Sequence, residues 1–394
     1  MKDSYSFKFK LFYLIYYGAI GSFMPYINVY LEKSAKLSGS QIGVITALSL
    51  IFGFCVTPIW GIIGDKTKGY NALLKISLGG ALVMVVLYYN ASTYLEIILC
   101  AIGLEMLRLG TTPMSDTLAT SYCHKIGGNY GSIRAMGSLG YMLSSMIVGF
   151  LADKIGLDGP LFISYAWLLI IALPITFSFP KNSREDKNKE DKVKQGNLKE
   201  LITNKNYRFI LGITILTTVI VDSSTNYAGN HLVSTLGGSE SLISWMTFIT
   251  VLPEVVFLMI AIKIIKKIGF KKYYILVVLS MILRFGIYSV TSNSYAFLAA
   301  SIFHCLGVSI STVGSLTYIR NSVNTAMLGT AITLFNASTS IGKAFFGYIF
   351  GVVYEYGNSY MIFMICATAF IVALLILLRT KRFDNIYVSK HKVG

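Results

Sequence analysis

Long apolar stretches recur along almost the whole 394-residue chain, and they limit its fold more than any other feature does. A helix that crosses the hydrocarbon core of a bilayer, about 30 Å thick, needs roughly 20 apolar residues. Twelve stretches meet this requirement, so the sequence predicts an all-α membrane protein with twelve spanning helices. Their expected limits are 9–31, 40–64, 71–90, 94–121, 130–152, 160–179, 206–236, 241–265, 273–291, 294–319, 325–353 and 358–378.

The composition excludes a soluble globular enzyme. Hydrophobic residues make up 54% of the chain and charged residues 13%, whereas a soluble domain carries about 25% charged residues. A net charge of +16 would indicate nucleic acid as the partner of a soluble protein, but here the basic residues lie between apolar stretches. We therefore expect them to face an anionic lipid bilayer, and we expect no nucleic-acid partner.

No chemistry-bearing motif of an enzyme is found at a water-facing position. The five cysteines are odd in number and lack metal-ligand spacing, so they predict neither a disulfide framework nor a metal site. A nucleophile motif and a phosphate-binding loop are also missing from the sequence. We therefore expect no catalytic residue, no metal and no cofactor.

Lys and Arg are distributed very unequally between the two sides of the predicted helices. The termini, the even-numbered loops and the adjoining helix ends carry 27 of them, and the opposite loops carry three, Lys33, Lys36 and Lys154. Because basic loops stay in the cytoplasm, we expect both termini there and the chain in the inner (cytoplasmic) membrane. A cleaved signal peptide is not expected, since the first apolar stretch is too long and no small-residue cleavage site follows it.

A polar segment of mixed charge, Lys181 to Asn197, divides the predicted helices into six plus six. It cannot bury a core, so it predicts a cytoplasmic linker at 181–205 between bundles at 1–180 and 206–380, with a tail at 381–394. Two pseudo-symmetric six-helix bundles around a site at the membrane midplane are typical of major facilitator transporters. We expect such a protein to function as a monomer.

The loop between the second and third predicted helices carries a short motif. Gly61 to Lys68 resembles the G-x-x-x-D-[RK]-x-[RK] signature of major facilitator transporters. The glycines would allow helices to approach closely, and Asp65 and Lys66 would form contacts in one conformation and release them in another. An ordinary short loop is the alternative interpretation. Lys263 to Lys272 looks like a degenerate copy that has lost the acid.

Ionisable residues inside the predicted helices are the main candidates for function, because each costs several kcal/mol unless it is paired or faces water. The acids and strong bases are equal in number, and one histidine, His304, accompanies them: Glu105, Asp116, Asp222, Glu254, Arg108, Arg134, Arg284 and Lys343. Ion pairing without any role in binding is the alternative for each. For Asp222 and Lys343 we expect such a pair between helices.

Helical spacing arranges several of these charges in polar stripes. Glu105, Arg108, Thr112 and Asp116 follow i, i+3, i+7, i+11, and Arg134, Ser138, Tyr141 and Ser145 follow a similar order. We expect both stripes to face one polar cavity. Similar stripes occur elsewhere: Asn336, Ser340 and Lys343, and more loosely Asp222, Asn226 and Asn230.

Other polar and small residues have simpler interpretations. Most of the 26 tyrosines are expected in interfacial belts and the core, with Tyr141 the exception. Small residues are expected to pack helices together: Gly131, Gly137, Gly140, Gly149, Gly347 and Gly351. His124 and His231 lie near loop ends, so they are expected to be solvated.

The segment from Asn129 to Tyr141, preceded by Pro113 to Asp116, closely resembles the lactose permease group of oligosaccharide:proton symporters. It also resembles the related phenylpropionate permease-like proteins. The resemblance continues through five further segments: Phe23 to Pro25, Gly61 to Lys68, Pro253–Glu254, Met281 to Arg284 and Phe303–His304.

The resemblance implies roles for six residues. Asp116 and Arg134 would clamp sugar hydroxyls while Tyr141 stacks on the ring. Glu254 and His304 would join binding to protonation, and Arg284 would tune the proton site. The second acid of the permease, three residues after its histidine, corresponds to Gly307 here, so Glu254 is the substitute proton carrier.

The leading hypothesis is therefore proton-coupled uptake of a sugar or small oligosaccharide by alternating access. Uptake of another polar or aromatic compound, such as an aromatic acid or nucleoside, is an alternative, because three intramembrane arginines could hold a carboxylate. Export of drugs or metabolites is a second, and a receptor that binds without transport is a third. Sodium is an alternative coupling ion, since Asp116 and Asp222 could coordinate it.

Overall fold

The computed structural model describes residues 2–67, 69–126, 129–179, 198–309, 314–324 and 327–383, and within these ranges helices and short connections form the whole structure. Most of the predicted linker, up to residue 197, and the tail from residue 384 lie outside the described residues. The helices divide into two compact units, each of which is described by itself.

Unit 1 comprises Met1–Asp186, Asn226–Phe248 and Gly347–Glu355. Its first segment forms seven described helices: α1 Lys2–Phe23, α2 Ile27–Lys33, α3 Gly39–Thr67, α4 Tyr70–Tyr89, α5 Tyr94–Ile126, α6 Tyr130–Ile155 and α7 Asp158–Phe177. The first predicted span, 9–31, is divided because the chain turns around Pro25, whose ring disfavours a helical residue before it.

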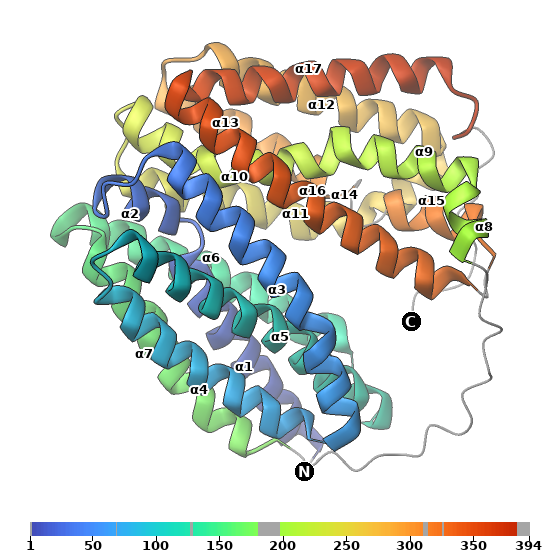
Figure 1. The fold of residues 1–394 in the computed structure, drawn as a ribbon. Coiled ribbons are helices and arrows are strands. Elements are labelled where there is room, and N and C mark those ends of the chain that lie inside the picture. The colour runs from blue at the N-terminus through green and yellow to red at the C-terminus, as the bar shows by residue number, and fades with distance from the viewer. Residues whose placement is uncertain are drawn as a thin grey trace. The chain divides into compact units, whose positions relative to one another are not determined.

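Unit 2 comprises Lys187–Thr225, Ile249–Phe346 and Tyr356–Gly394. The helical segments from residue 198 onward, some shared with unit 1, are α8 Leu198–Thr203, α9 Lys205–Thr214, η1 Ile215–Val219, α10 Ile220–Asn230, η2 His231–Thr235, α11 Glu240–Ile268, α12 Phe270–Val290, α13 Ser294–Ala300, η3 Ser301–Phe303, α14 His304–Ser309, α15 Ser315–Ser322, α16 Leu328–Tyr356 and α17 Ser359–Arg379. Figure 1 gives their order along the chain.

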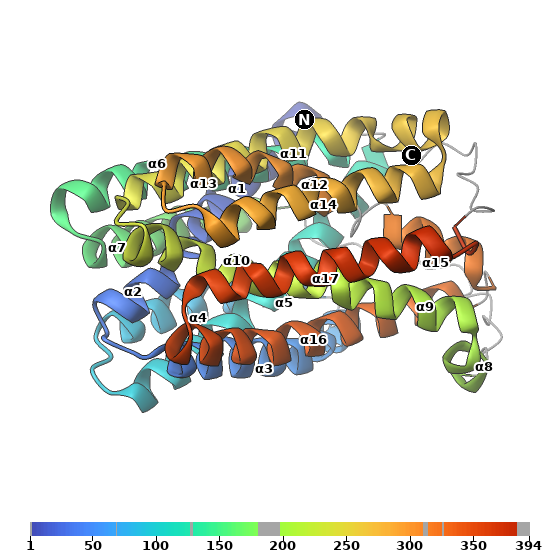
Figure 2. The ribbon, with the colours of Figure 1, turned by 90° about the horizontal axis from the view of Figure 1, so that it is seen from above.

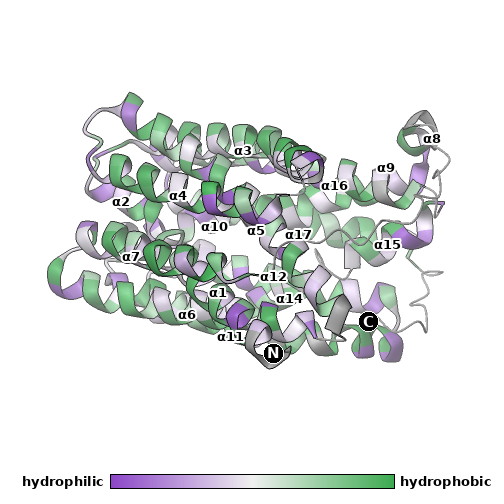
Figure 3. Ribbon diagram, turned by 90° about the horizontal axis from the view of Figure 1, so that it is seen from below, coloured by the Kyte–Doolittle hydropathy of each residue, from purple (hydrophilic) through white to green (hydrophobic). Residues whose placement is uncertain are grey.

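The helices match the predicted spans to within a few residues at most ends. Eight helical segments in the described ranges are long and apolar enough to cross a membrane: Gly39–Gly64, Tyr70–Tyr89, Tyr130–Ile155, Asp158–Phe177, Lys205–Thr235, Glu240–Leu258, Phe270–Val290 and Ser359–Arg379. The other four predicted spans correspond to α1, the charge-bearing α5, the divided α13 to α15, and α16. Figure 3 shows that the helices of both units are mainly hydrophobic.

Within unit 1, α1 packs against α6 and α7, while α3 and α4 both pack on α5 (Figures 1 and 2). A methyl group on Gly140 would collide with the backbone of Leu14, and one on Gly21 would collide with the backbone of Tyr141. The α1 and α6 backbones therefore touch, and only glycine permits this contact. The predicted packing role of Gly140 is confirmed.

A second close approach occurs where the end of α16 crosses the start of α3. A Cβ on Gly351 would collide with the backbone of Gly39 and lie 2.8 Å from the Cα of Gly43. A Cβ on Gly347 would lie 3.4 Å from the side chain of Thr46 on α3, which is an ordinary van der Waals contact. The packing role that the sequence predicts for Gly347 and Gly351 is confirmed.

In unit 2, α12 packs along α17 and also contacts α13 and α14. Stacked and edge-on rings fill this contact: Phe285, Tyr288, Phe297, Phe363 and Phe370.

The helix from Lys205 to Thr235 contains two π-helical turns, η1 and η2. Such turns often occur at functional sites, and η1 ends three residues before Asp222.

Candidate functional site

Asp116 of α5 is held by tyrosines of two other helices in unit 1. The hydroxyl of Tyr13 on α1 donates to Oδ1 of Asp116 over 2.6 Å. Tyr130 at the start of α6 lies beside the same carboxylate, and its ring meets Tyr13 edge-on with centroids 6.4 Å apart. The acid that the sequence places in the clamp is thus fixed in position by hydrogen bonding from an aromatic neighbour.

Arg134 of α6 rests on the next turn of α1. Its guanidinium lies over the ring of Tyr17, 4.3 Å from the ring centroid. Tyr17 in turn stacks on Tyr13, with 5.6 Å between centroids and 27° between planes. Within the described ranges Asp116 and Arg134 form no ion pair with each other, so adjacent tyrosines hold the two charges apart.

The sequence of α1 explains this arrangement. Tyr13, Tyr16 and Tyr17 are spaced i, i+3, i+4, so they share one face of the helix. All three are buried. Tyr16 donates to the backbone carbonyl of Arg108 over 3.3 Å, which ties the same face to α5. Interpreting these tyrosines as core residues misses the contacts of Tyr13 with Asp116 and of Tyr17 with Arg134. The spacing along α1 indicates only that the three tyrosines share one face.

Glu105 and Arg108 pair with each other, one turn apart on α5. The Arg108 Nε donates to Oε2 of Glu105 over 2.8 Å, and Nη2 forms a second short contact with Oε1. The side chains are 10% and 19% exposed. A bidentate pair of this kind neutralises both charges inside the bilayer. Glu105 and Arg108 therefore fit the alternative named for each intramembrane charge, an ion pair without a role in binding.

Tyr141 lies at the contact between α1 and α6, where its backbone meets Gly21. Its side chain is half-buried. The residue lies two turns beyond Arg134 on the same helix. Its stacking role remains a prediction.

In unit 2, Lys343 of α16 and Asp222 of α10 form the predicted ion pair. Nζ lies 2.6 Å from Oδ2, and the two side chains are 32% and 41% exposed. The Ser223 hydroxyl adds a hydrogen bond of 3.3 Å to the backbone carbonyl of Lys343. The predicted interhelical pair is confirmed.

A second polar contact in unit 2 joins Arg284 of α12 to His304 of α14. Nη1 of Arg284 lies 2.9 Å from Nδ1 of His304. Because a guanidinium only donates hydrogen bonds, Nδ1 must accept, and neutral His304 carries its hydrogen on Nε2. Arg284 is 3% exposed, and the rings of Phe285 and Tyr288 lie within about 5 Å of its guanidinium carbon.

Glu254 of α11 is half-buried, one residue after Pro253. It lies close enough to the side chain of Cys305, the neighbour of His304, to interact with it electrostatically. A side chain on Gly307 would run into the end of Met281. Met281 therefore occupies the space in which the second acid of lactose permease-like proteins would begin.

The motif between α3 and α4 is described in part. The side chain of Asp65 and the whole of Lys68 lie outside the described residues, whereas Lys66 is exposed in the last turn of α3. A Cβ on Gly61 would meet no atom within 4 Å, while one on Gly64 would meet the Tyr70 ring. No close approach is seen at the Cβ position of Gly61, although the Tyr70 hydroxyl donates to the Gly61 carbonyl over 3.5 Å. The switch role of Gly61, Asp65 and Lys66 stays a prediction.

His231 is fully buried, so the prediction of a solvated histidine is wrong. The helix continues through η2 to Thr235, and the loop begins only after it. His231 therefore lies inside a helical turn with the buried residues Leu232 and Val233. The side chain of His124 lies outside the described residues.

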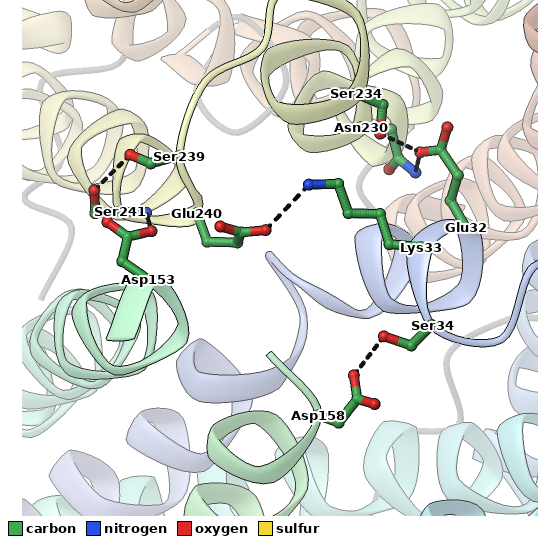
Figure 4. Close-up of polar contacts among 10 residues, drawn as sticks. All are labelled: Glu32, Lys33, Ser34, Asp153, Asp158, Asn230, Ser234, Ser239, Glu240 and Ser241. Atoms are coloured by element: carbon green, nitrogen blue, oxygen red, sulfur yellow. Dashed lines mark hydrogen bonds and ion pairs between the residues drawn. The ribbon is translucent and has the colours of Figure 1, made fainter. Parts of the chain in front are cut away.

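The sequence gives no direct indication of a polar cluster at the helix ends of unit 1, which we call the loop cluster. Its members are Glu32, Lys33, Asn230, Ser234 and Glu240, which Figure 4 shows, and Tyr354. Glu32 accepts from the Asn230 amide over 2.6 Å, the Ser234 hydroxyl over 2.9 Å and the Tyr354 hydroxyl over 2.8 Å. Lys33 pairs with Glu240 at 3.2 Å. Asn230, which the sequence placed loosely in a stripe with Asp222, therefore has its side-chain amide bound to Glu32 in this cluster.

Two further acids near the loop cluster receive backbone hydrogen bonds. Asp153 accepts from the amide of Ser241 over 3.0 Å, and Glu355 accepts from the amide of Ser40 over 2.8 Å. Each of these acids lies near the end of a predicted span and on the side opposite the basic loops. That shared position places these acids on one side of the membrane, but it does not indicate which residues they contact.

Within the described residues, no group of three or more His, Cys, Asp or Glu side chains could hold a metal ion. The model of the MFS_1 like family matches residues 6–379. A maltose permease of Geobacillus stearothermophilus is 27% identical over 378 residues, which cover 95% of each chain.

Two solved structures have the same arrangement of helices. The nucleoside transporter NupG gives a TM-score of 0.84 at 16% identity, covering 95% of this chain and 99% of that one. A D-xylose-proton symporter gives 0.69 at 14% identity, covering 98% and 99%.

Proposed function

The chain belongs to the MFS_1 like family of membrane transporters, and we propose that it takes up a sugar or small oligosaccharide together with a proton. It is a multi-pass membrane protein with the major facilitator fold, and it is a secondary transporter and not an enzyme. Proteins of this fold expose their binding site to one side of the membrane at a time.

The observation that carries the proposal is the arrangement around Asp116 and Arg134. One carboxylate and one exposed guanidinium are presented beside the stacked rings of Tyr13 and Tyr17. Neighbouring sugar hydroxyls suit such a pair, because the carboxylate accepts and the planar guanidinium donates two hydrogen bonds each. Tyr141, half-buried on the same helix as Arg134, is the ring that we propose to lie against the apolar face of a pyranose.

The relationship to the maltose permease supports a saccharide as substrate, since the similarity extends over nearly the whole of both chains. Arg134 supports it as well. Its guanidinium lies over an aromatic ring and pairs with no carboxylate in the described part of the chain, so its N–H groups can donate to a ligand.

For the proton, we assign Glu254 as carrier and Arg284 with His304 as the group that responds to it. The Arg284–His304 hydrogen bond requires an unprotonated Nδ1, and an imidazolium beside a guanidinium would be repelled. His304 is therefore poorly placed to carry the proton in this arrangement. Glu254, a half-buried carboxylate close to Cys305 in unit 2, is the better carrier.

The charge bias supports an orientation with both termini in the cytoplasm. A location in the inner membrane and function as a monomer are further parts of the proposal. In that orientation the loop cluster lies on the outer side. Its contacts bind α2 to the neighbouring parts of η2, α11 and α16 in unit 1. Opening the protein to the outside would then require Glu32 and Lys33 to leave their partners.

Counterflow in proteoliposomes tests the substrate class. Vesicles are loaded with one unlabelled compound and diluted into a trace of the same labelled compound, with maltose, monosaccharides, nucleosides and aromatic acids compared in parallel. The proposal predicts transient accumulation with a saccharide. Counterflow with a nucleoside or an aromatic acid, and none with any saccharide, would refute it.

A further inference from the structure

The hydroxyl of Tyr17 is buried without a hydrogen-bond partner in the described part of the chain. Tyr17 is 8% exposed, so water reaches little of it. A buried polar group without a partner costs free energy, and most such groups in folded proteins are satisfied. The hydroxyl therefore needs an explanation that the protein alone does not supply.

The position of Tyr17 points to a ligand. Its ring carries Arg134 at 4.3 Å and stacks on Tyr13, whose hydroxyl holds Asp116. Tyr16 meets the Tyr17 ring edge-on, with centroids 5.4 Å apart. Three neighbours thus fix the ring, and its hydroxyl belongs to the same group of side chains as the two charges of the proposed clamp.

Thr112 is a candidate for a partner within the protein. Its side chain lies near enough to the Tyr17 hydroxyl to interact with it, but no described group meets the distance and angle of a hydrogen bond to that hydroxyl. Tyr16 lies on the same face of α1, and its hydroxyl donates a hydrogen bond to the backbone carbonyl of Arg108. The difference between these two neighbouring tyrosines sets Tyr17 apart from an ordinary buried tyrosine.

We propose that the Tyr17 hydroxyl binds the substrate directly, through one hydroxyl of the polyhydroxy compound that Asp116 and Arg134 hold. This assignment rests on the proposed function, because it deepens the description of the same site. A phenol that is fixed in advance loses little entropy on binding, and its hydrogen bond is gained only when the ligand arrives. Tyr17 would then select ligands that carry a hydroxyl at one position.

The test compares Tyr17→Phe with Tyr88→Phe. The Tyr88 hydroxyl is also buried without a partner among the described residues, but its ring packs against Phe23 and Phe162, away from Asp116 and Arg134. Both changes remove one buried hydroxyl. We expect Tyr17→Phe to raise the KM for the transported sugar about tenfold at unchanged maximal rate. Tyr88→Phe should leave the KM unchanged.

Monodeoxy sugars sharpen the comparison. Wild-type protein should bind one monodeoxy analogue about tenfold more weakly than the parent sugar, and Tyr17→Phe should no longer distinguish the two. A packing defect would not produce this selective loss. A Tyr17→Phe variant that discriminates among the analogues as wild type does would overturn the proposal.

Melting of the ligand-free proteins separates this inference from the proposed function. If Tyr17 has no partner in the protein, Tyr17→Phe should melt at the wild-type temperature or above it, and a lower melting temperature would contradict the inference. If none of the saccharides stabilises wild type, the proposed function fails. The KM and melting comparisons are then made with whichever compound in the counterflow series is transported, and the ligand-free melting result still decides.

Discussion

Replacing Arg108 by methionine is expected to destabilise the protein strongly, because Arg108 is the partner of a carboxylate inside a spanning helix. The Glu105 and Arg108 side chains are 10% and 19% exposed and form two hydrogen bonds. Removing one partner of a buried ion pair typically costs about 3–5 kcal/mol, since the other charge is left without compensation. Methionine keeps most of the volume, so the change isolates the charge.

The Lys343–Asp222 pair provides the matched comparison. Its side chains are 32% and 41% exposed, so water can solvate Asp222 when its partner is removed. Exposed pairs contribute about 0–1 kcal/mol. Arg108→Met should therefore cost at least about 2 kcal/mol more than Lys343→Met, the difference between these two ranges.

Unfolding by SDS titration in mixed detergent micelles, followed by tryptophan fluorescence, measures this difference. Adding Glu105→Gln to Arg108→Met removes the uncompensated carboxylate, so it should recover most of the loss. Equal stabilities for Arg108→Met and Lys343→Met would refute the reasoning. A double variant no more stable than Arg108→Met would refute it as well, because Glu105 would then not be the source of the cost.

Three further predictions concern transport. Arg134→Lys should weaken substrate binding about 10- to 100-fold with unchanged melting, because an ammonium cannot reproduce the planar fork, and binding measured by thermal shift checks this. Glu254→Gln should retain counterflow but lose accumulation against a gradient; accumulation by this variant would place the proton site elsewhere. Lys33→Glu should favour opening of the loop cluster, because it replaces the Lys33–Glu240 pair with two like charges. Adding Glu240→Lys should restore an opposite-charge pair and reverse the effect. The rate at which a cysteine introduced at Ser34 is labelled measures the opening.

The sequence was sufficient to predict the spans and one ion pair. Apolar length determines where helices lie, since no other structure satisfies the backbone in lipid. The pairing of Asp222 with Lys343 was predictable for a related reason, because an unpaired charge on either helix would be costly. The glycines at 140, 347 and 351 were predictable from their spacing.

Other features depend on packing that no local pattern contains. Glu105 and Arg108 belong to the same stripe as Asp116, yet they close on each other because their i, i+3 spacing allows a bidentate contact. His231 is near a loop in the sequence, but the π-helical turn η2 keeps it inside the helix. Tyr13 and Tyr17 look like ordinary core residues until α5 and α6 place Asp116 and Arg134 against them.

The loop cluster shows the same limit. Glu32 and Glu240 lie next to apolar stretches in the sequence, so they look like solvated residues at helix ends. Their partners are about 200 residues away along the chain, so only the tertiary structure brings them together.

Sugar-driven proton movement tests the central claim most directly. Wild-type protein is reconstituted with a trapped pH-sensitive dye and with the membrane potential clamped, and an inward gradient of saccharide is applied. The account predicts acidification of the vesicle interior that wild type supports and Glu254→Gln does not. Saccharide entry without any acidification, or acidification that persists in Glu254→Gln, would contradict it, and dependence of entry on external sodium would identify the alternative coupling ion.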